Sequence, residues 1–279
     1  MNLNPLFIKA PTLSDAWFQA LYKCVEQGRE FIIDQGSYAG QKRLEFDHIT
    51  VQITQPWVEP LLPKVNPLLG FPDPVAEGYL DDYLPYMMTG EEKPGEAYTY
   101  GQRICSVKSL RGFDFSVDNK LKDKLYIDYK EIPETVLDVY TSIYPDQDPD
   151  SFVAVFPNLF NQMELMIWTY KNKGHRNNQM ILQVGQPSDM LLKDPPCLRH
   201  IDTRIQDGKL HFFPYFRSWD LFGGFPANLA AIEMMKQYCA AEIGVENGEI
   251  IASSKGLHIY DYVFEIAEAI RGRKIEEFK

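Results

Sequence analysis

The sequence contains few cysteines, and they form no pattern. Its 279 residues include only four, Cys24, Cys105, Cys197 and Cys239, with no CxxC pair and no histidine at the spacing of a metal site. This scatter excludes a disulfide framework and predicts that the protein holds no metal ion. For most of the four, a small buried side chain in a reducing compartment is the simplest interpretation.

The chain also lacks long apolar runs and an excess of basic residues. No run approaches the ~18 residues that a membrane span needs, and the first residues, MNLNPLFIKAP, lack the charged-then-apolar order of a signal peptide. Lysine and arginine number 28 against 39 aspartates and glutamates, so the net charge is -11 and the surface repels nucleic-acid backbones. We therefore expect a cytoplasmic protein that binds neither membranes nor nucleic acid, although a few arginines in one pocket suffice for a small phosphorylated ligand.

The rest of the composition is that of a globular protein, with 45% hydrophobic and 24% charged residues. Apolar periodicity predicts helices over 14–28, 160–170 and 228–243, the first of them capped by Ser14-Asp15. Alternation predicts strands over 43–53, 180–184, 209–215 and 249–252. Together these predict an α+β fold, in which residues 1–279 form a single domain with a mixed sheet packed by long helices.

The intervening segments are less regular. The proline-rich stretch 56–74 predicts an irregular connection, and 171–178 predicts a polar turn. Residues 75–88 suit a helix that Pro85 would kink or confine to its first turn. An acidic, aromatic stretch over 104–157 carries DQDPD at 146–150 and predicts only one helix, near 134–143. We interpret 104–157 as an insertion within the domain, whose Tyr126 and Tyr129 could cover a bound ligand.

Three short strings hold residue types that carry chemistry. The first is Asp194-Pro195-Pro196-Cys197, in which two prolines present a cysteine. The second is FRSWDLFGGFPAN, over 216–228, and the third is KGLHIY, over 255–260. Each string alone is weak, since a lone cysteine after proline is more often a buried side chain than a nucleophile.

Taken together, the three strings resemble the thymidylate synthase family. Steps of 20, 11 and 30 residues separate Cys197, Arg217, Asn228 and His258, and the family shows a Pro-Cys nucleophile, an Arg-Ser-x-Asp-x-x-x-Gly-x-Pro-x-Asn string and a His-x-Tyr pair in this order. The likeness covers 160–262 well and the first hundred residues loosely. It implies a homodimeric methyltransferase that converts dUMP to dTMP, with 5,10-methylenetetrahydrofolate as co-substrate and without a metal.

The chemistry of these residue types agrees with the resemblance. A Cys197 thiolate that adds to C6 of uracil makes C5 nucleophilic, provided that a cation such as the Arg217 guanidinium lowers the pKa of the thiol. The Asn228 amide offers a donor and an acceptor to O4 and N3-H, which favours uracil over cytosine. Arg217 and Ser218 suit a phosphate, whereas His258 and Tyr260, two apart on a strand, suit a ribose hydroxyl.

The resemblance also implies a folate subsite at Asp220 and Gly224, and it places Tyr100, of Tyr100-Gly101, near the C5 carbon that loses a proton. Simpler interpretations exist for several of these residues. Asp220 could cap a helix that starts near Pro226, Asn228 could cap the long helix, and His258 could be a core histidine.

The departures from the family pattern leave other activities open. Asn177 and Asn178 stand where the family has two cross-subunit arginines, so Arg176 is the single candidate. Asp82 is the nearest candidate for the family's catalytic carboxylate. Arg43 is a candidate for the phosphate, or else an exposed cation at a strand edge.

Two further departures concern the covering of folate, because no tryptophan precedes Tyr100 closely and only 19 residues follow Tyr260. The main alternative is a 5-hydroxymethylase for dUMP, dCMP or CMP, in which water replaces hydride. A catalytically silent nucleotide-binding module is a third interpretation.

Overall fold

The computed structural model describes residues 2–34, 38–91, 93–94, 96, 98–105, 161–192 and 194–278. Residues 104 and 105, with which the predicted insertion starts, belong to helix α3 (Tyr100–Cys105). The remainder of the insertion, including the predicted helix near 134–143 and both candidate lid tyrosines, lies outside the described residues.

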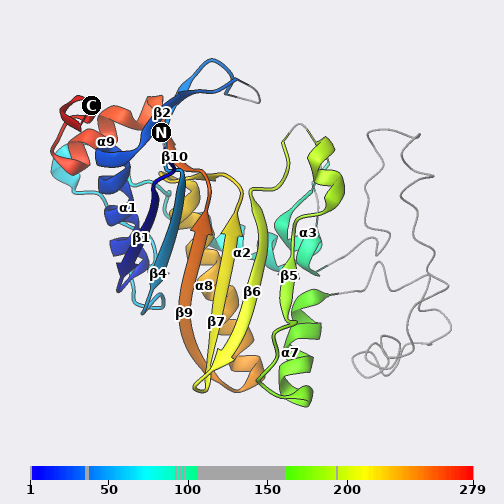
Figure 1. Cartoon of the computed structure of the whole chain (residues 1–279). Coiled ribbons are helices and arrows are strands. Elements are labelled where there is room, and N and C mark those ends of the chain that lie inside the picture. Colours follow the sequence, from blue (N-terminus) through cyan, green and yellow to red (C-terminus); the bar gives the residue numbers. More distant parts are fainter. Residues whose placement is uncertain are drawn as a thin grey trace.

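A six-stranded mixed sheet forms the centre of the fold (Figure 1), in the order β1-β4-β9-β7-β6-β5. Its strands are β1 (Pro5–Ala10), β4 (His48–Ile53), β5 (Ile181–Gln183), β6 (Leu198–Gln206), β7 (Lys209–Phe216) and β9 (Glu246–Ser254). Two of the neighbouring pairs, β1 with β4 and β7 with β9, are parallel, and the others are antiparallel. The predicted α+β class with a mixed sheet is therefore confirmed.

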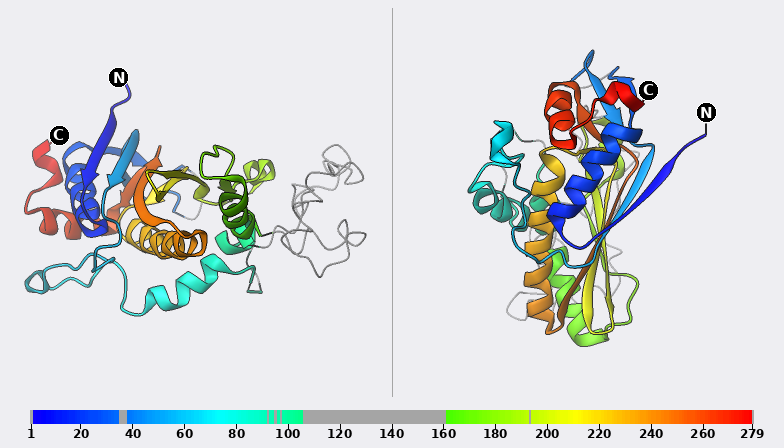
Figure 2. Two further views of the ribbon diagram at one scale, coloured as in Figure 1. Left: turned by 90° about the horizontal axis from the view of Figure 1, so that it is seen from below. Right: turned by 90° about the vertical axis from the view of Figure 1, so that its left-hand side faces the viewer.

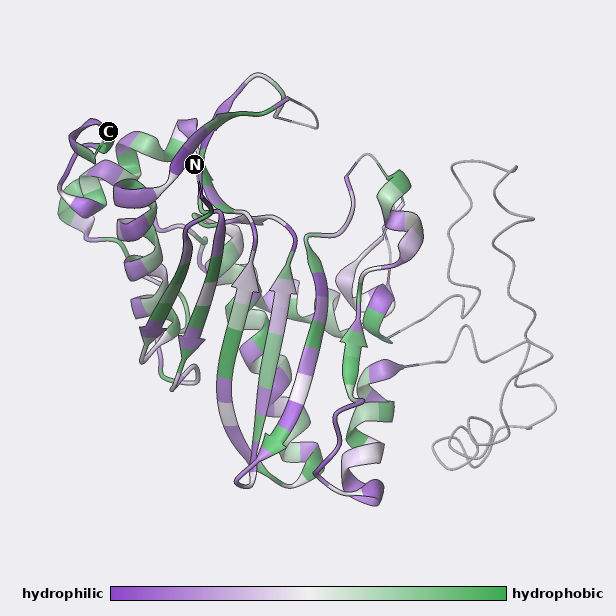
Figure 3. Ribbon diagram, in the orientation of Figure 1, coloured by the Kyte–Doolittle hydropathy of each residue, from purple (hydrophilic) through white to green (hydrophobic). Residues whose placement is uncertain are grey.

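Alternating side chains give this sheet one buried face. Along β7 every second residue is buried, including Leu210, Phe212 and Phe216, and bands of hydrophobic and hydrophilic residues alternate along β6 in Figure 3. Helices α1 (Leu13–Gln27) and α8 (Gly224–Ile243) lie against the buried face, and in the edge-on view of Figure 2 they stand on one side of the sheet. The half-buried residues on the other side therefore remain uncovered by any described helix.

Helix α8 buries most of its residues in the core. It starts at Gly224, four residues before its predicted start, and ends at Gly244, whose left-handed φ of 87° terminates the helix. Two charged side chains, Glu233 and Lys236, are 0% exposed and pair at 3.0 Å. Glu233 also accepts from Asn247, and the Lys236 ammonium donates to the carbonyl of Gly248. The partners are required because an isolated buried charge is strongly unfavourable.

We expect Glu233→Ala to lower the free energy of unfolding by roughly 3–5 kcal/mol, because it leaves the Lys236 ammonium buried without its carboxylate. Urea denaturation followed by circular dichroism measures the change. Glu242→Ala, at an exposed position of the same helix, is the matched control and should change the free energy by less than about 0.5 kcal/mol. Similar small effects in both variants would contradict the assigned role of the pair.

A four-stranded sheet, in the order β2-β3-β10-β8, adjoins one end of the large sheet. Its strands are β2 (Arg29–Ile32), β3 (Lys42–Glu45), β8 (Trp219–Asp220) and β10 (Leu257–Tyr260). The prediction of one continuous strand over 43–53 is therefore wrong, because β3 and β4 belong to different sheets. The chain changes sheets at Asp47, whose carboxylate binds the Arg29 guanidinium at 2.8 Å and accepts from the Asn4 amide.

The other predicted elements hold with shifted ends. Helix α1 is capped by Thr12, not by Ser14, since the Thr12 hydroxyl accepts from the Asp15 amide. Pro85 lies inside α2 (Tyr79–Met88) beyond its first turn. The polar turn predicted from 171 begins later, because α7 (Gln162–Lys173) continues through Lys173. Further helices are α9 (Phe264–Arg271) and short 3-10 turns at η1 (Pro67–Leu69), η4 (Pro187–Leu191), η5 (Asp261–Val263) and η6 (Ile275–Phe278).

Candidate active site

The segment that carries Cys197 (194–197) and the segment that carries Arg217 (216–228) meet where β6 begins and β7 ends, at the upper end of the sheet in Figure 1. Leu198 pairs with Phe216 across these strands. The residues just outside this pair are Cys197 and Arg217, and the Arg217 amide donates to the Cys197 carbonyl at 2.8 Å. Antiparallel pairing thus brings together two predicted site residues that are 20 positions apart.

The Arg217 guanidinium holds the loop that presents the cysteine. Its Nε donates to the carbonyls of Pro195 and Pro196 at 3.2 Å, and its Nη2 lies 3.3 Å from the Asp194 carboxylate. The neighbouring Ser218 is half-buried in the turn between β7 and β8. Arg217 is therefore a positioning group for the loop as well as a local positive charge.

The Cys197 thiol lies in a half-buried setting of mixed charge. Burial raises its pKa above the ordinary value, against a lowering by Arg217, while Asp194 and Asp220 add to the rise. Arg217 thus acts in the predicted direction, but burial outweighs it, and the expectation of a lowered pKa is wrong. At neutral pH the thiol is protonated, so that any attack by its sulfur requires the loss of a proton.

Two tyrosines, one just before α3 and one at its first residue, lie beside the thiol. The Tyr100 hydroxyl accepts from the Leu198 amide at 3.3 Å, and the ring of Tyr98 lies next to it, with centroids 6.5 Å apart. Burial raises the pKa of Tyr100 well above its ordinary value and that of Tyr98 to about 12, and Cys197 adds to both rises. Tyr100 therefore stays protonated and keeps its own hydrogen free to donate, and Tyr98 is a neighbour that sequence reasoning missed.

The Asn228 amide is held from two sides. It lies in the second turn of α8 rather than at the cap, so the simpler interpretation of Asn228 as a helix cap is wrong. Its Oδ1 accepts from the Trp219 indole at 3.0 Å, and its Nδ2 donates to the Tyr83 hydroxyl at 2.6 Å. The structure thus brings Trp219 and Tyr83, which sequence reasoning missed, to a predicted site residue.

The residue of α2 that reaches this site is Tyr83 and not Asp82. Asp82 is exposed and, among the described residues, bonds to neither Cys197 nor Asn228. Tyr83 is half-buried. Burial raises its pKa, and Cys197 is among the groups that add to the rise. The position of Asp82 thus gives no support to its assignment as the carboxylate. The rings of Tyr79, Tyr83 and Tyr86 stack along α2, and Tyr83 is the one that contacts Asn228.

His258 presents an unused acceptor. It is 2% exposed, and its Nδ1 lies 2.8 Å from the Gly256 carbonyl. Because a carbonyl only accepts, Nδ1 carries the hydrogen and Nε2 is an acceptor. Nε2 is buried and has no partner among the described residues. Burial lowers the pKa of His258, so the ring is neutral at pH 7 and offers Nε2 to a hydroxyl that donates to it.

Tyr260 and Arg43 face each other in the pairing of β10 with β3. Arg43 binds the Glu45 carboxylate at 2.7 Å, and its Nε is buried without a hydrogen-bond partner among the described residues. Because β3 lies between β2 and β10, the interpretation of Arg43 as an exposed cation at a strand edge is wrong. Burial raises the pKa of Tyr260 to about 12, with a further contribution from Asp220.

Asp220 lies just before the start of α8. Its carboxylate accepts from the amides of Phe222, Gly223 and Gly224 at 2.9–3.1 Å. A Cβ at Gly224 would meet the Asp220 Cβ at 3.2 Å, so a small residue allows this close approach. Asp220 thus binds amides at the start of α8 from outside the helix, while the N-cap position itself is Gly223. Asp220 also lies close enough to raise the pKa of both Cys197 and Tyr260.

Arg176 lies at the opposite end of the large sheet. It lines a pocket of about 490 Å³ together with Arg204 and the turn at Asp207, beyond the end of β6. Cys197 precedes the other end of that strand. Eight residues of extended chain at ~3.3 Å each put the two ends on the order of 25 Å apart. Arg176 therefore cannot serve the Cys197 site of its own chain.

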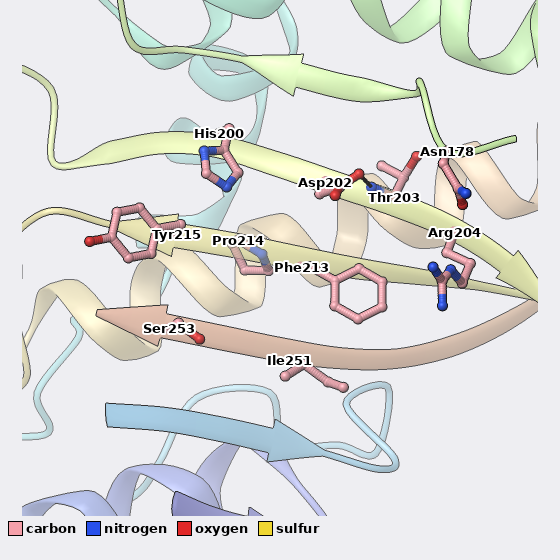
Figure 4. Close-up of a pocket in the computed structure, with 10 residues that line it drawn as sticks. All are labelled: Asn178, His200, Asp202, Thr203, Arg204, Phe213, Pro214, Tyr215, Ile251 and Ser253. Carbon is pink, nitrogen blue, oxygen red and sulfur yellow. Dashed lines mark hydrogen bonds between the residues drawn. The ribbon is translucent and has the colours of Figure 1, made fainter. Parts of the chain in front are cut away.

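A second pocket, of about 400 Å³, opens on the uncovered face of the large sheet (Figure 4). The rings of Phe213 and Tyr215 lie along β7, and the Ile251 side chain lies on β9 below them, whereas Asp202 and Arg204 are on β6. This face is half apolar and half polar, and Cys197 is not among the residues that line the pocket.

The described residues include neither a metal-binding cluster nor a membrane-spanning helix. They contain no group of three or more histidine, cysteine, aspartate or glutamate side chains that could hold a metal ion. None of their helices is both long and apolar enough to cross a membrane.

The raised pKa of Cys197 predicts a particular pH profile. Alkylation of Cys197 by iodoacetamide should keep accelerating through the ordinary range of a free thiol, about 8–9, because only the thiolate reacts. Asp194→Asn should shift the midpoint to lower pH, since it removes a charge that disfavours the thiolate. Peptide mass spectrometry follows each cysteine separately. Cys105, with its pKa raised to about 12 by burial and Glu164, should keep its profile in Asp194→Asn. A Cys197 midpoint below the ordinary value would contradict the assignment.

Comparison with known proteins supports the family resemblance over most of the chain. The thymidylate synthase family model matches residues 141–278. Proteins named "Putative thymidylate synthase" from Methanosarcina barkeri and Methanococcoides burtonii are each 28% identical over 265 residues, which are 94% of this chain and 93% of theirs. A protein of the same name from Methanosarcina acetivorans is 27% identical over the same shares.

Proposed function

The chain carries a thymidylate synthase-family domain, and from this premise we propose that it methylates C5 of dUMP to give dTMP, with 5,10-methylenetetrahydrofolate as co-substrate. One observation carries the proposal: the Cys197 thiol, the Arg217 guanidinium and the Asn228 amide converge from three separate elements. A backbone hydrogen bond joins Cys197 to Arg217. A side-chain hydrogen bond joins Asn228 to Tyr83, and Cys197 lies close enough to Tyr83 to raise the pKa of its hydroxyl.

The nucleotide would be held by groups with unused capacity. A ribose hydroxyl that donates to the buried Nε2 of His258 would satisfy that atom. Arg217 and Ser218 lie beside the cysteine loop and suit the 5'-phosphate, since the bonds of the Arg217 side chain to the described residues involve Nε and Nη2 and leave Nη1 for a phosphate oxygen. Asn228 would then bind the base by donating one N-H to O4 and accepting from N3-H through its amide oxygen.

The bond changes follow from these positions. After losing its proton, the Cys197 sulfur adds to C6, and the electron pair of the C5–C6 double bond moves toward O4, where an Asn228 N-H stabilises the negative charge. C5 would then attack the one-carbon unit of the co-substrate, and the C5 proton would pass to a base such as a water molecule that accepts from the protonated Tyr100 hydroxyl. The bond between the one-carbon unit and the folate nitrogen would break. Hydride from the released tetrahydrofolate, which becomes dihydrofolate, would reduce that unit to a methyl group while the bond between sulfur and C6 breaks and restores the double bond and the thiolate.

Two observations favour hydroxymethylation as a second candidate. Trp219 is 2% exposed and packs between Phe216 and Phe225, with centroids 3.9 Å and 4.6 Å from theirs. It therefore cannot cover a folate. Asp220 already accepts three backbone N-H groups, which reduces its capacity for a pterin ring. Both features weaken the exclusion of water that hydride transfer requires.

One experiment separates the two reactions. The protein is incubated with methylenetetrahydrofolate and, separately, dUMP, dCMP, UMP or CMP. Formation of dihydrofolate is followed by absorbance, and the nucleotide product is identified by mass spectrometry. Dihydrofolate that appears in step with dTMP supports the methylation proposal. A 5-hydroxymethyl nucleotide formed without dihydrofolate would support hydroxymethylation instead. If no nucleotide is turned over, both proposed reactions are overturned.

A further inference from the structure

The hydrogen bonds of the Asn228 amide leave it only one orientation. The indole N-H of Trp219 is a donor with no capacity to accept, so the amide atom 3.0 Å from it must be the oxygen. The amide nitrogen then faces Tyr83, whose hydroxyl accepts from it at 2.6 Å. The usual ambiguity between an amide and its flipped form is thereby removed by the chemistry of Trp219.

The surroundings of Trp219 keep its N-H in place. The indole ring is parallel to the Phe216 ring, with an interplanar angle of 5°, and is also packed against Phe225. The parallel Phe216 ring, the contact with the tilted Phe225 ring and near-complete burial prevent the indole ring from turning away. The donor is thus as rigid as the core of the domain.

We propose that Trp219 is the specificity-determining residue of the site, because it locks the Asn228 amide in the orientation that accepts uracil and rejects cytosine. The inference rests on the proposed function, in that it takes the ligand to be a pyrimidine nucleotide. Asn228 keeps one N-H for O4 and one lone pair for N3-H. Cytosine needs the flipped amide, which would put an amide N-H against the indole N-H.

Tyr83 has a different role in the same chain of bonds. A hydroxyl can accept from an amide nitrogen or donate to an amide oxygen, so Tyr83 stabilises both orientations. Burial raises the pKa of Tyr83, which keeps the hydroxyl protonated and available for either bond. Tyr83 is therefore a positioning residue that steadies Asn228 without choosing between the bases.

The test measures equilibrium binding of dUMP and dCMP without folate, so that it does not depend on turnover. The unsubstituted protein should prefer dUMP by roughly ten- to hundredfold, the range expected for one mispaired polar contact. Trp219→Phe should lose most of this preference, mainly by binding dCMP more tightly. Tyr83→Phe should weaken both nucleotides and keep their ratio. The proposal is overturned if folded Trp219→Phe keeps the full preference.

The controls separate this proposal from others. Trp17→Phe also removes a buried indole donor, in this case to the Leu221 carbonyl at 2.9 Å, and should keep the preference. If Trp219→Phe fails to fold, Asn228→Asp replaces it: a carboxylate has no N-H to offer O4, so the preference should relax, and its persistence would overturn the proposal. If the unsubstituted protein binds neither nucleotide, the proposed function is refuted. If it binds both equally, only the proposed role of Trp219 in fixing the Asn228 amide is refuted.

Discussion

Cys197→Ala should abolish both turnover and the covalent adduct with 5-fluoro-dUMP. Fluorine cannot leave C5 as a proton does, so the unsubstituted protein, with methylenetetrahydrofolate present, should accumulate a complex joined through the Cys197 sulfur. The alanine variant has no sulfur at this position and should show no added mass. Turnover should fall by more than about 10⁴-fold, the scale seen when a nucleophile is removed.

The measurement is intact-mass spectrometry after denaturation, which reports only covalent adducts. Cys105→Ala is the matched control, because Cys105 is half-buried like Cys197 but lies at the end of α3, outside the hydrogen-bonded site. That variant should form the adduct fully. An adduct that persists in Cys197→Ala would show that another side chain is the nucleophile.

The positions of the main site residues could be predicted because their spacing is local and their pairing is simple. The interval from Cys197 to Arg217 corresponds to one antiparallel hairpin, of which the sequence predicted only the second strand, over 209–215, and not the first. His258 and Tyr260 lie two residues apart on one strand, as alternation requires. The shared side of these two residues follows from the alternation of side chains along a strand and needs no further structural information.

The sequence predicted less where the rotation of a helix about its axis, or the burial of a side chain, decides which residue reaches the site and how its pKa shifts. Asp82 and Tyr83 are adjacent on α2, and a step of one residue turns a side chain by about 100°. Only Met87 of that helix is buried, so the hydrophobic pattern did not show which side faces the site. The net pKa shift of Cys197 depends on burial, which no local pattern displays. The role of Trp219 depends on the packing of Phe216 and Phe225 around it.

The structure also limits what a single chain can do with Arg176. The open face of the large sheet bears the Phe213 and Tyr215 rings and a pocket of about 400 Å³, and the family resemblance implies a homodimer built on a sheet face. We propose that two copies pair through this face. Pairing would bring Arg176 of one copy toward the Cys197 site of the other, which the ~25 Å within one chain forbids.

Mixing Arg176→Ala with Cys197→Ala should therefore restore activity above that of either variant alone. Arg176→Ala should lose roughly ten- to hundredfold in activity, the value of one charge-assisted bond to a phosphate. A mixed dimer contains one site with the intact Cys197 of the first variant and the intact Arg176 of the second. Random exchange of subunits makes such sites up to about a quarter of the total.

The assay is dTMP formation after partial unfolding and refolding of the mixture, with each variant treated alone for comparison. Mixing Arg217→Ala with Cys197→Ala is the matched control. Both of those residues serve the same site of one chain, so every mixed dimer has one site without Cys197 and one without Arg217, and no activity should return. Recovery only in the Arg176 mixture requires a site shared between subunits. A protein that light scattering shows to be monomeric at micromolar concentration, or equal recovery in both mixtures, would contradict the shared site.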